Sequence, residues 1–158
     1  MKLNQAGLLF RIHRQEDTEM IVSMINKDRH HMSFGTTTKM FEQELDEPGE
    51  RGRDNTFVVI KGSTIVGYYS LFFVDQSTHN AVYCYATVDM DWRIQGIGTA
   101  IFHHLFAHLE RIAQIEKKPI HFIHRAMTSI PGETTLGMNL GMEEISSLHI
   151  MCLRLWVR

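Results

Sequence analysis

The sequence has few cysteines, few prolines and almost no net charge. Its 158 residues include 2 cysteines and 3 prolines, and 16 Lys and Arg against 18 Asp and Glu give a formal charge of −2. Cys84 and Cys152 fit neither a disulfide framework nor a Cys-x-x-Cys metal site, so we expect small apolar side chains in a reducing compartment. The absence of a basic excess argues against nucleic acid or an anionic membrane as the main partner.

Long hydrophobic runs are also absent. No apolar run reaches the ~20 residues that span a bilayer, and the first residues show no apolar stretch with a small-residue cleavage site. Hydrophobic residues make up 44% and charged residues 22% of the chain, which is typical of a folded globular domain. The length suits a single domain over residues 1–158. The sequence therefore predicts one cytoplasmic domain that does not enter a membrane.

The hydrophobic pattern predicts a domain with both helices and strands. Runs rich in β-branched and aromatic residues predict strands over 8–13, 56–60, 65–74, 81–88, 120–126 and 145–157. Apolar positions at helical spacing predict helices over 18–28 and 38–45, from about 99 to 118, and within 128–140. Strands come first and a strand–helix–strand unit follows. This order predicts an α/β (α+β) domain with a mixed sheet.

The most distinctive segment is a glycine loop between the predicted strand over 81–88 and the long helix. Gly96 and Gly98 lie directly before that helix. A helix start leaves roughly four N–H groups unpaired and carries a partial positive charge. Glycine lets the backbone approach a ligand closely and adopt positive φ. The loop therefore suits a phosphate or pyrophosphate, with a plain strand-to-helix turn as the alternative.

Three known kinds of anion-binding loop contain glycines at a helix start. The Walker A string GxxxxGK[ST] does not occur. A dinucleotide fingerprint requires a third glycine where this chain has Ile101, so a nucleotide-binding regulator is disfavoured. The third kind is the acyl-CoA loop, [QR]xxGx[GA], which is matched by Arg93-Ile94-Gln95-Gly96-Ile97-Gly98.

Residues 88–100, VDMDWRIQGIGTA, resemble the pyrophosphate-binding motif of the GNAT superfamily of acyl-CoA N-acyltransferases. The resemblance extends over most of the chain. Three further segments resemble parts of the family. Phe10-Arg11-Ile12 with Glu16-Asp17 resembles its first strand and helix start, and residues 62–68 resemble the hairpin of its second and third strands. Leu140-Gly141-Met142 lies where the family usually has a Gly-Phe pair after its last helix.

The resemblance implies a mixed, mostly antiparallel sheet that splays between the strands over 81–88 and 120–126, flanked by the four predicted helices. Acetyl-CoA would be the co-substrate, and the primary amine of a small molecule or peptide would attack it directly. The main chain of Val88 would contact the pantetheine, and Arg93 would lie near the phosphates. The residues expected to bind acetyl-CoA are Val88, Arg93, Ile94, Gln95, Gly96, Ile97, Gly98 and Thr99.

The catalytic positions depart from the family pattern. The tyrosine that usually acts as the acid corresponds to Gly137. Thr134 lies one turn earlier and is a candidate for that role. The alternatives are that Thr134 is an ordinary helix-start residue and that water protonates the departing thiolate. Tyr85 is the candidate polar group near the reacting centre, with a core aromatic as the alternative. These departures leave a second hypothesis open, a GNAT-fold CoA-binding sensor or scaffold without chemistry.

The predicted strand over 81–88 contains no carboxylate for a general base. Glu42, Glu44 and Asp75 are alternative bases that would act through water, each with a solvated surface charge as the alternative.

His104 and His108 have the i,i+4 spacing of metal ligands, but no HExxH string is present. We expect these histidines on a solvated helix surface, and no metal is predicted. The last stretch, over 145–157, lacks turn residues. It predicts either a strand broken near Ser146-Ser147 or one long strand whose open edge a second subunit covers, in which case the protein is a homodimer.

Overall fold

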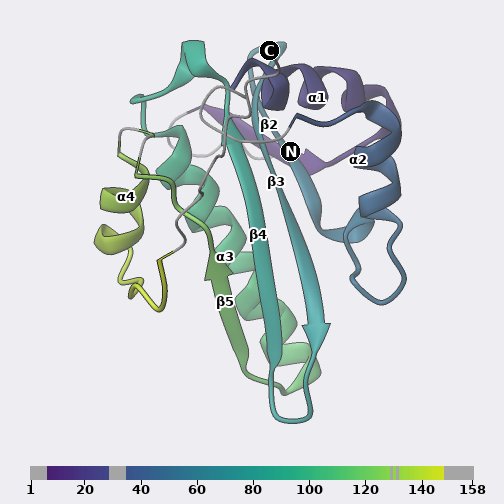
Figure 1. Cartoon of the computed structure of the whole chain (residues 1–158), viewed down its shortest axis with the longest axis vertical. Helices are drawn as coiled ribbons and strands as arrows, with labels where there is room; N and C mark the ends of the chain where they lie inside the picture. The colour runs from purple at the N-terminus through teal and green to yellow at the C-terminus, as the bar shows by residue number, and fades with distance from the viewer. Residues whose placement is uncertain (1–6, 29–34, 129, 131, 148–158) are drawn as a thin grey trace, which may run out of the picture.

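The computed structural model describes residues 7–28, 35–128, 130 and 132–147. Nine helices and strands occur among them: β1 (Leu8–Ile12), α1 (Thr18–Lys27), α2 (Thr38–Leu45), β2 (Thr56–Lys61), β3 (Thr64–Asp75), β4 (Asn80–Val88), α3 (Ile97–Glu116), β5 (Ile120–His124) and α4 (Glu133–Asn139). Figure 1 shows a central sheet that is long in the direction of β3 and β4. Short 3₁₀ turns precede α1 and β2 and follow β4.

The strands form one sheet in the order β1-β2-β3-β4-β5. The first four strands are antiparallel neighbours, and β5 runs parallel to β4. β3 and β4 pair along their whole shared length, from Gly67 opposite Val88 to Asp75 opposite Asn80. The mixed, mostly antiparallel sheet predicted from the sequence is thereby confirmed.

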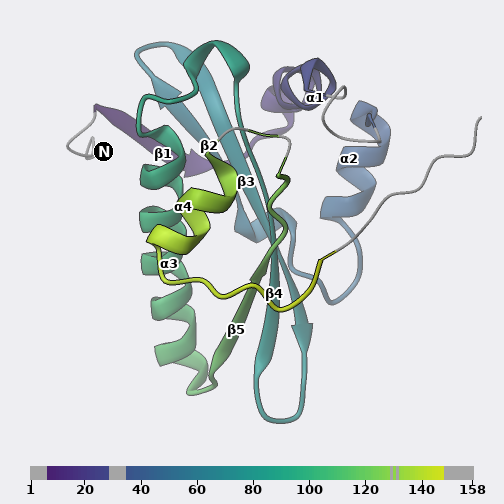
Figure 2. The ribbon, with the colours of Figure 1, turned by 60° about the vertical axis from the view of Figure 1, so that its left-hand side comes forward.

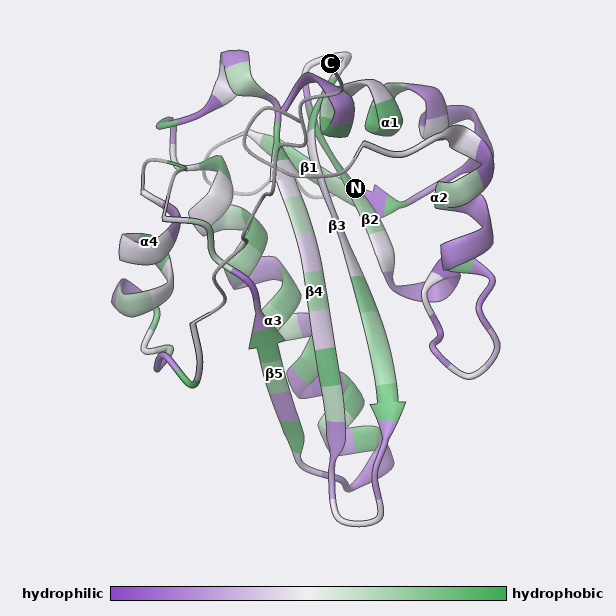
Figure 3. Cartoon of the chain, viewed as in Figure 1, coloured by the Kyte–Doolittle hydropathy of each residue, from purple (hydrophilic) through white to green (hydrophobic). Residues whose placement is uncertain are grey.

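Helices cover both faces of the sheet (Figure 2). α3 and α4 lie on one side, and α1 and α2 lie on the other. Because successive side chains of a strand point to opposite faces of the sheet, β3 contributes core side chains to both layers. Tyr69 and Leu71 pack with Leu105 of α3, whereas Tyr68 and Phe72 pack against α1 and α2. This two-sided burial explains why the lower half of β3 is uniformly hydrophobic in Figure 3.

The ends of α3 follow from local backbone preferences. Gly96, at φ 79°, is the residue before the helix, and Lys117, at φ 52°, is the residue after it. Pro119 then prevents helix continuation, as the sequence predicts. β5 ends at His124, two residues earlier than its apolar pattern predicts, because its pairing with β4 stops there.

The expectation that His104 and His108 lie on a solvated helix surface was wrong. His104 stacks on Phe10 with ring centroids 4.2 Å apart, and its Nδ1 lies 2.8 Å from the Tyr69 hydroxyl. The Nε2 atom of His108 lies 2.7 Å from Oδ1 of Asn55. Both rings flank the apolar stripe of α3 and pack edge-on against Phe57 of β2, with ring centroids 5.1 and 5.0 Å apart. Burial lowers the pKa of His104 to about 4.

The predicted strand over 145–157 lies mostly outside the described residues, and the homodimer it suggested stays a prediction. Residues 145–147 are exposed and form neither helix nor strand. Within the ranges that the structure describes, no helix is long and apolar enough to cross a membrane.

Candidate active site

A split in the sheet forms a cavity beside the glycine loop. The pairing of β4 with β5 ends where Cys84 lies opposite His124, while β4 continues to Val88. The edge of β4 beyond Cys84 therefore faces a cavity of about 330 Å³ instead of a strand. An extended ligand arm can pair with such a strand edge through main-chain hydrogen bonds. This is the splay that the resemblance to the GNAT superfamily implies between the strands over 81–88 and 120–126.

Residues from both layers of the structure line the cavity. Tyr68, and Thr87 opposite it on β4, line it from the layer of α1 and α2. Ala86, Ile101 and Phe102 line it from the layer of α3. The cavity therefore lies at the junction of the two layers.

The glycine loop forms one wall of this cavity. The wall includes Val88, Arg93, Ile94, Gly96, Gly98 and Thr99, six of the eight residues expected to bind acetyl-CoA. Gln95 does not line the cavity, and Ile97 is 2% exposed in the core below the loop.

The backbone of the loop explains its two glycines differently. Gly96 adopts a left-handed φ of 79°, although a Cβ there would meet nothing within 4 Å. Position 96 therefore requires glycine because of its backbone conformation and not because of a lack of space. A Cβ on Gly98 would lie 3.2 Å from Cδ2 of Leu136 on α4, so this glycine permits close packing of α3 and α4 beside the cavity.

Arg93 is held by protein groups within the cavity wall. Its guanidinium forms an ion pair with Asp28, whose side chain is 3% exposed, and its Nε donates to the carbonyl of Val88 at 3.1 Å. Nearby, Lys27 lies 3.4 Å from Asp89 in a second ion pair. These contacts fasten the end of α1 to the glycine loop. Because Asp28 neutralises Arg93, the backbone N–H groups at the start of α3 are the main source of positive potential.

Tyr85 lies at the cavity and is 51% exposed, so it is not a core aromatic. Its ring meets the edge of Phe72 at a centroid distance of 5.7 Å. Thr134 is half-buried on α4 and is not among the residues that line the cavity.

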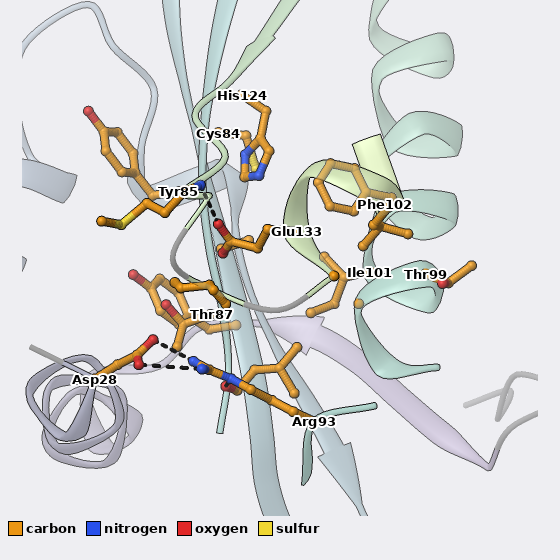
Figure 4. Close-up of a pocket in the computed structure, with 18 of the residues that line it drawn as sticks. Asp28, Cys84, Tyr85, Thr87, Arg93, Thr99, Ile101, Phe102, His124 and Glu133 are labelled. Carbon is orange, nitrogen blue, oxygen red and sulfur yellow. Dashed lines mark hydrogen bonds and ion pairs between the residues drawn. The ribbon is translucent and has the colours of Figure 1, made fainter. Parts of the chain in front are cut away.

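Glu133, which the sequence reasoning missed, lines the cavity from the first position of α4. Its carboxylate accepts a hydrogen bond from the Met127 N–H at 2.7 Å (Figure 4). Burial raises the pKa of Glu133 above its ordinary value, although the Met127 N–H and Arg93 act in the opposite direction.

The alternative bases lie elsewhere. Glu42 hydrogen-bonds to Thr18 and pairs with Arg53 at 2.7 Å. Asp75 pairs with Lys118. Neither of these carboxylates lines the cavity, nor does Glu44.

His124 and Cys84 close the end of the cavity where the strands meet. Burial raises the pKa of the Cys84 thiol and lowers the pKa of His124, so both groups stay neutral near pH 7. Nδ1 of His124 has no hydrogen-bond partner among the described residues. No cluster of three or more His, Cys, Asp or Glu suited to a metal ion occurs in the part of the chain that the structure describes.

Sequence reasoning missed Asp28, His124 and Glu133. The sequence offered a signal only for Glu133, which lies four residues before Gly137 and so on the same side of a helix. Asp28 and His124 reach the cavity through tertiary packing, which a single sequence does not show.

Comparisons with known proteins agree with this geometry. The model of the acetyltransferase (GNAT) family matches residues 19–124, about two thirds of the chain. The chain therefore belongs to the acetyltransferase (GNAT) family. Comparison with curated protein sequences gives no significant match.

Solved structures of similar fold include several acetyltransferases. A predicted acetyltransferase from Clostridium acetobutylicum, solved with acetyl-CoA, is 13% identical with a TM-score of 0.64, over 92% of this chain and 96% of that one. The ribosomal-protein-S18-alanine N-acetyltransferase from Escherichia coli is 17% identical with a TM-score of 0.66, over 88% and 79%. An aminoglycoside acetyltransferase from an uncultured soil metagenomic sample, in complex with sisomicin, is 16% identical with a TM-score of 0.57, over 96% and 97%.

Proposed function

We propose that this protein transfers the acetyl group of acetyl-CoA to a primary amine of a small molecule or peptide. The observation that carries the proposal is the cavity at the split between β4 and β5, with the glycine loop as one wall. The strand edge offers hydrogen bonds for an extended pantetheine arm. The helix start offers N–H groups for a pyrophosphate.

A cavity at the junction of the two layers suits direct transfer. Acetyl-CoA would lie against α3 and α4, and the amine would reach the thioester from the side of α1 and α2. A lysine-like amine with a pKa of roughly 10.4 is only about 0.1% neutral at pH 7. A group that accepts a proton beside the thioester therefore accelerates the attack, by about 10²–10⁴-fold in general acid–base catalysis.

The fold does not fix the acceptor. The similar structures include a ribosomal-protein-S18-alanine N-acetyltransferase and an aminoglycoside acetyltransferase. The acceptor panel should therefore contain both peptides and polyamine-like small molecules.

The test is release of the CoA thiol from acetyl-CoA in the presence of such a panel, with acetyl-CoA affinity measured by calorimetry. We expect saturable binding and amine-dependent thiol release. Tight binding without release for any amine would favour the sensor or scaffold hypothesis, for which Gly137 is the motivating observation. Absence of binding would refute both.

A further inference from the structure

We infer that Glu133 is a catalytic residue that carries the proton from the attacking amine to the departing sulfur of CoA. The inference rests on the proposed function and adds a residue to it. It replaces the earlier candidate for the acid, Thr134, which lies outside the cavity lining.

The position of Glu133 supports the role first. The residue opens α4, directly beside the cavity, and its carboxylate points into the space between His124 and Arg93 in Figure 4. One hydrogen bond, from the Met127 N–H at 2.7 Å, orients it. A carboxylate can accept further hydrogen bonds after that one, so Glu133 keeps the capacity to take a proton from a bound reactant.

The other ionisable groups around the cavity are less suited to the role. Asp28 is buried in its ion pair with Arg93. Burial raises the pKa of Tyr68 and of Cys84, so neither hydroxyl nor thiol ionises near neutral pH. Burial lowers the pKa of His124, which makes its ring a weaker base, and that ring packs edge-on against Phe102 at 5.1 Å.

Three more ionisable groups line the cavity: Arg93, Arg125 and Tyr85. The two arginines stay protonated throughout the working range and cannot relay a proton. Among the described residues, the cavity is lined by two carboxylates, Asp28 and Glu133. Asp28 is in an ion pair, whereas Glu133 is not.

The proposed step conserves protons and electrons. The neutral amine nitrogen attacks the thioester carbonyl carbon, an N–C bond forms, and the proton lost from nitrogen passes to the Glu133 carboxylate. The tetrahedral intermediate then collapses, the C–S bond breaks, and the sulfur leaves with the electron pair. Glu133 returns the proton to that sulfur, so the enzyme ends as it began.

The closing experiment uses Glu133→Gln, which keeps an oxygen for the Met127 N–H but cannot carry a proton. Glu143→Gln is the matched control, because Glu143 is exposed beyond the end of α4. Acetyl-CoA affinity, kcat and the pH dependence of kcat are measured for both and for the wild type with the same amine.

We expect Glu133→Gln to lower kcat by about 100-fold, with acetyl-CoA affinity unchanged. The wild type should lose activity at low pH with an apparent pKa above the ordinary 4.5 of glutamate, and this limb should vanish in Glu133→Gln. Glu133→Asp, which retains a carboxyl group, should recover part of the rate.

Several outcomes would overturn the assignment. Wild-type turnover that Glu133→Gln leaves intact would refute the role of Glu133 while the proposed function stands. The same holds if kcat falls only in step with acetyl-CoA affinity, or if His124→Gln, and not Glu133→Gln, removes the acidic limb. A wild type that binds acetyl-CoA but acetylates no amine would refute the proposed function itself.

Discussion

Ile94 carries the most strained backbone among the residues of the glycine loop. Its φ of 58° lies in the left-handed region, which a β-branched side chain rarely adopts, and its side chain is 93% exposed. The strained backbone therefore does not serve to bury the Ile94 side chain. Such outliers concentrate at ligand-binding sites.

Substitutions in the loop should reveal this strain. Asn tolerates a left-handed conformation, so Ile94→Asn should raise the free energy of unfolding by about 0.5–1 kcal/mol.

Gly96→Ala should lower the free energy of unfolding by about 1 kcal/mol, since Gly96 has a φ of 79° and no crowding. Urea denaturation measures both. Ile94→Asn less stable than the wild type would contradict the strained geometry.

Tyr85 presents its exposed ring to the cavity from the layer of α1 and α2. If its hydroxyl contacts the acceptor, Tyr85→Phe should raise the KM for the amine by about 3–10-fold, the value of one hydrogen bond. Acetyl-CoA affinity and stability should stay unchanged. Tyr83→Phe is the matched control, because Tyr83 shares the strand face, is 41% exposed and does not line the cavity. Equal effects of the two substitutions would remove Tyr85 from the site.

At the scale of elements, the contact between α3 and α4 sets one wall of the cavity. Gly98→Val should lower acetyl-CoA affinity at least about tenfold, or 1.4 kcal/mol. The new side chain would crowd Leu136, whose Cδ2 lies 3.2 Å from the Cβ position, and would also obstruct the helix start. Calorimetry with acetyl-CoA measures the effect.

Gly137→Ala provides the control within the same pair of helices. A Cβ there would lie 3.7 Å from the sulfur of Met142, an ordinary contact, and Gly137 does not line the cavity. We expect about 0.5–1 kcal/mol of added stability from the better helix former, with unchanged affinity. Unchanged affinity in Gly98→Val as well would mean that the loop does not bind acetyl-CoA.

The elements differ in how far the sequence predicts them. α3 was predictable because its apolar stripe is long and Pro119 ends it. The early end of β5 at His124 was not, because strand length here depends on where the partner strand diverges. The glycine loop was predictable from local spacing. The position of Glu133 at the cavity was not, because it depends on how α4 docks beside the split in the sheet.

At the scale of the whole molecule, buried histidines link stability to pH. Burial lowers the pKa of His13, His104, His108 and His124 in the folded state. In the unfolded chain these histidines have a pKa of about 6.5, which is higher than their pKa in the folded state. The full free energy of unfolding is therefore present above that pH. Stability should then fall as the pH drops from 6.5 and level off once the folded-state rings also protonate.

His104 tests this linkage most clearly, because its pKa of about 4 is furthest from the ordinary value. The free energy of unfolding should decrease between pH 6.5 and pH 4 by about 1–2 kcal/mol less in His104→Gln than in the wild type. This value allows for the part of the ring that water reaches. His103→Gln, at an exposed neighbour, should keep the wild-type slope. Urea denaturation at several pH values measures the slopes, and parallel curves for all three proteins would contradict the argument.

The most direct test of the central claim, that the co-substrate lies in the split between β4 and β5, is a map of backbone amide chemical shifts on titration with CoA. The account predicts the largest changes at residues 85–88 of β4 and 96–99 at the start of α3, with smaller changes at α4. Changes confined to α2 or to the distal β3–β4 turn, or no change at saturating CoA, would contradict it.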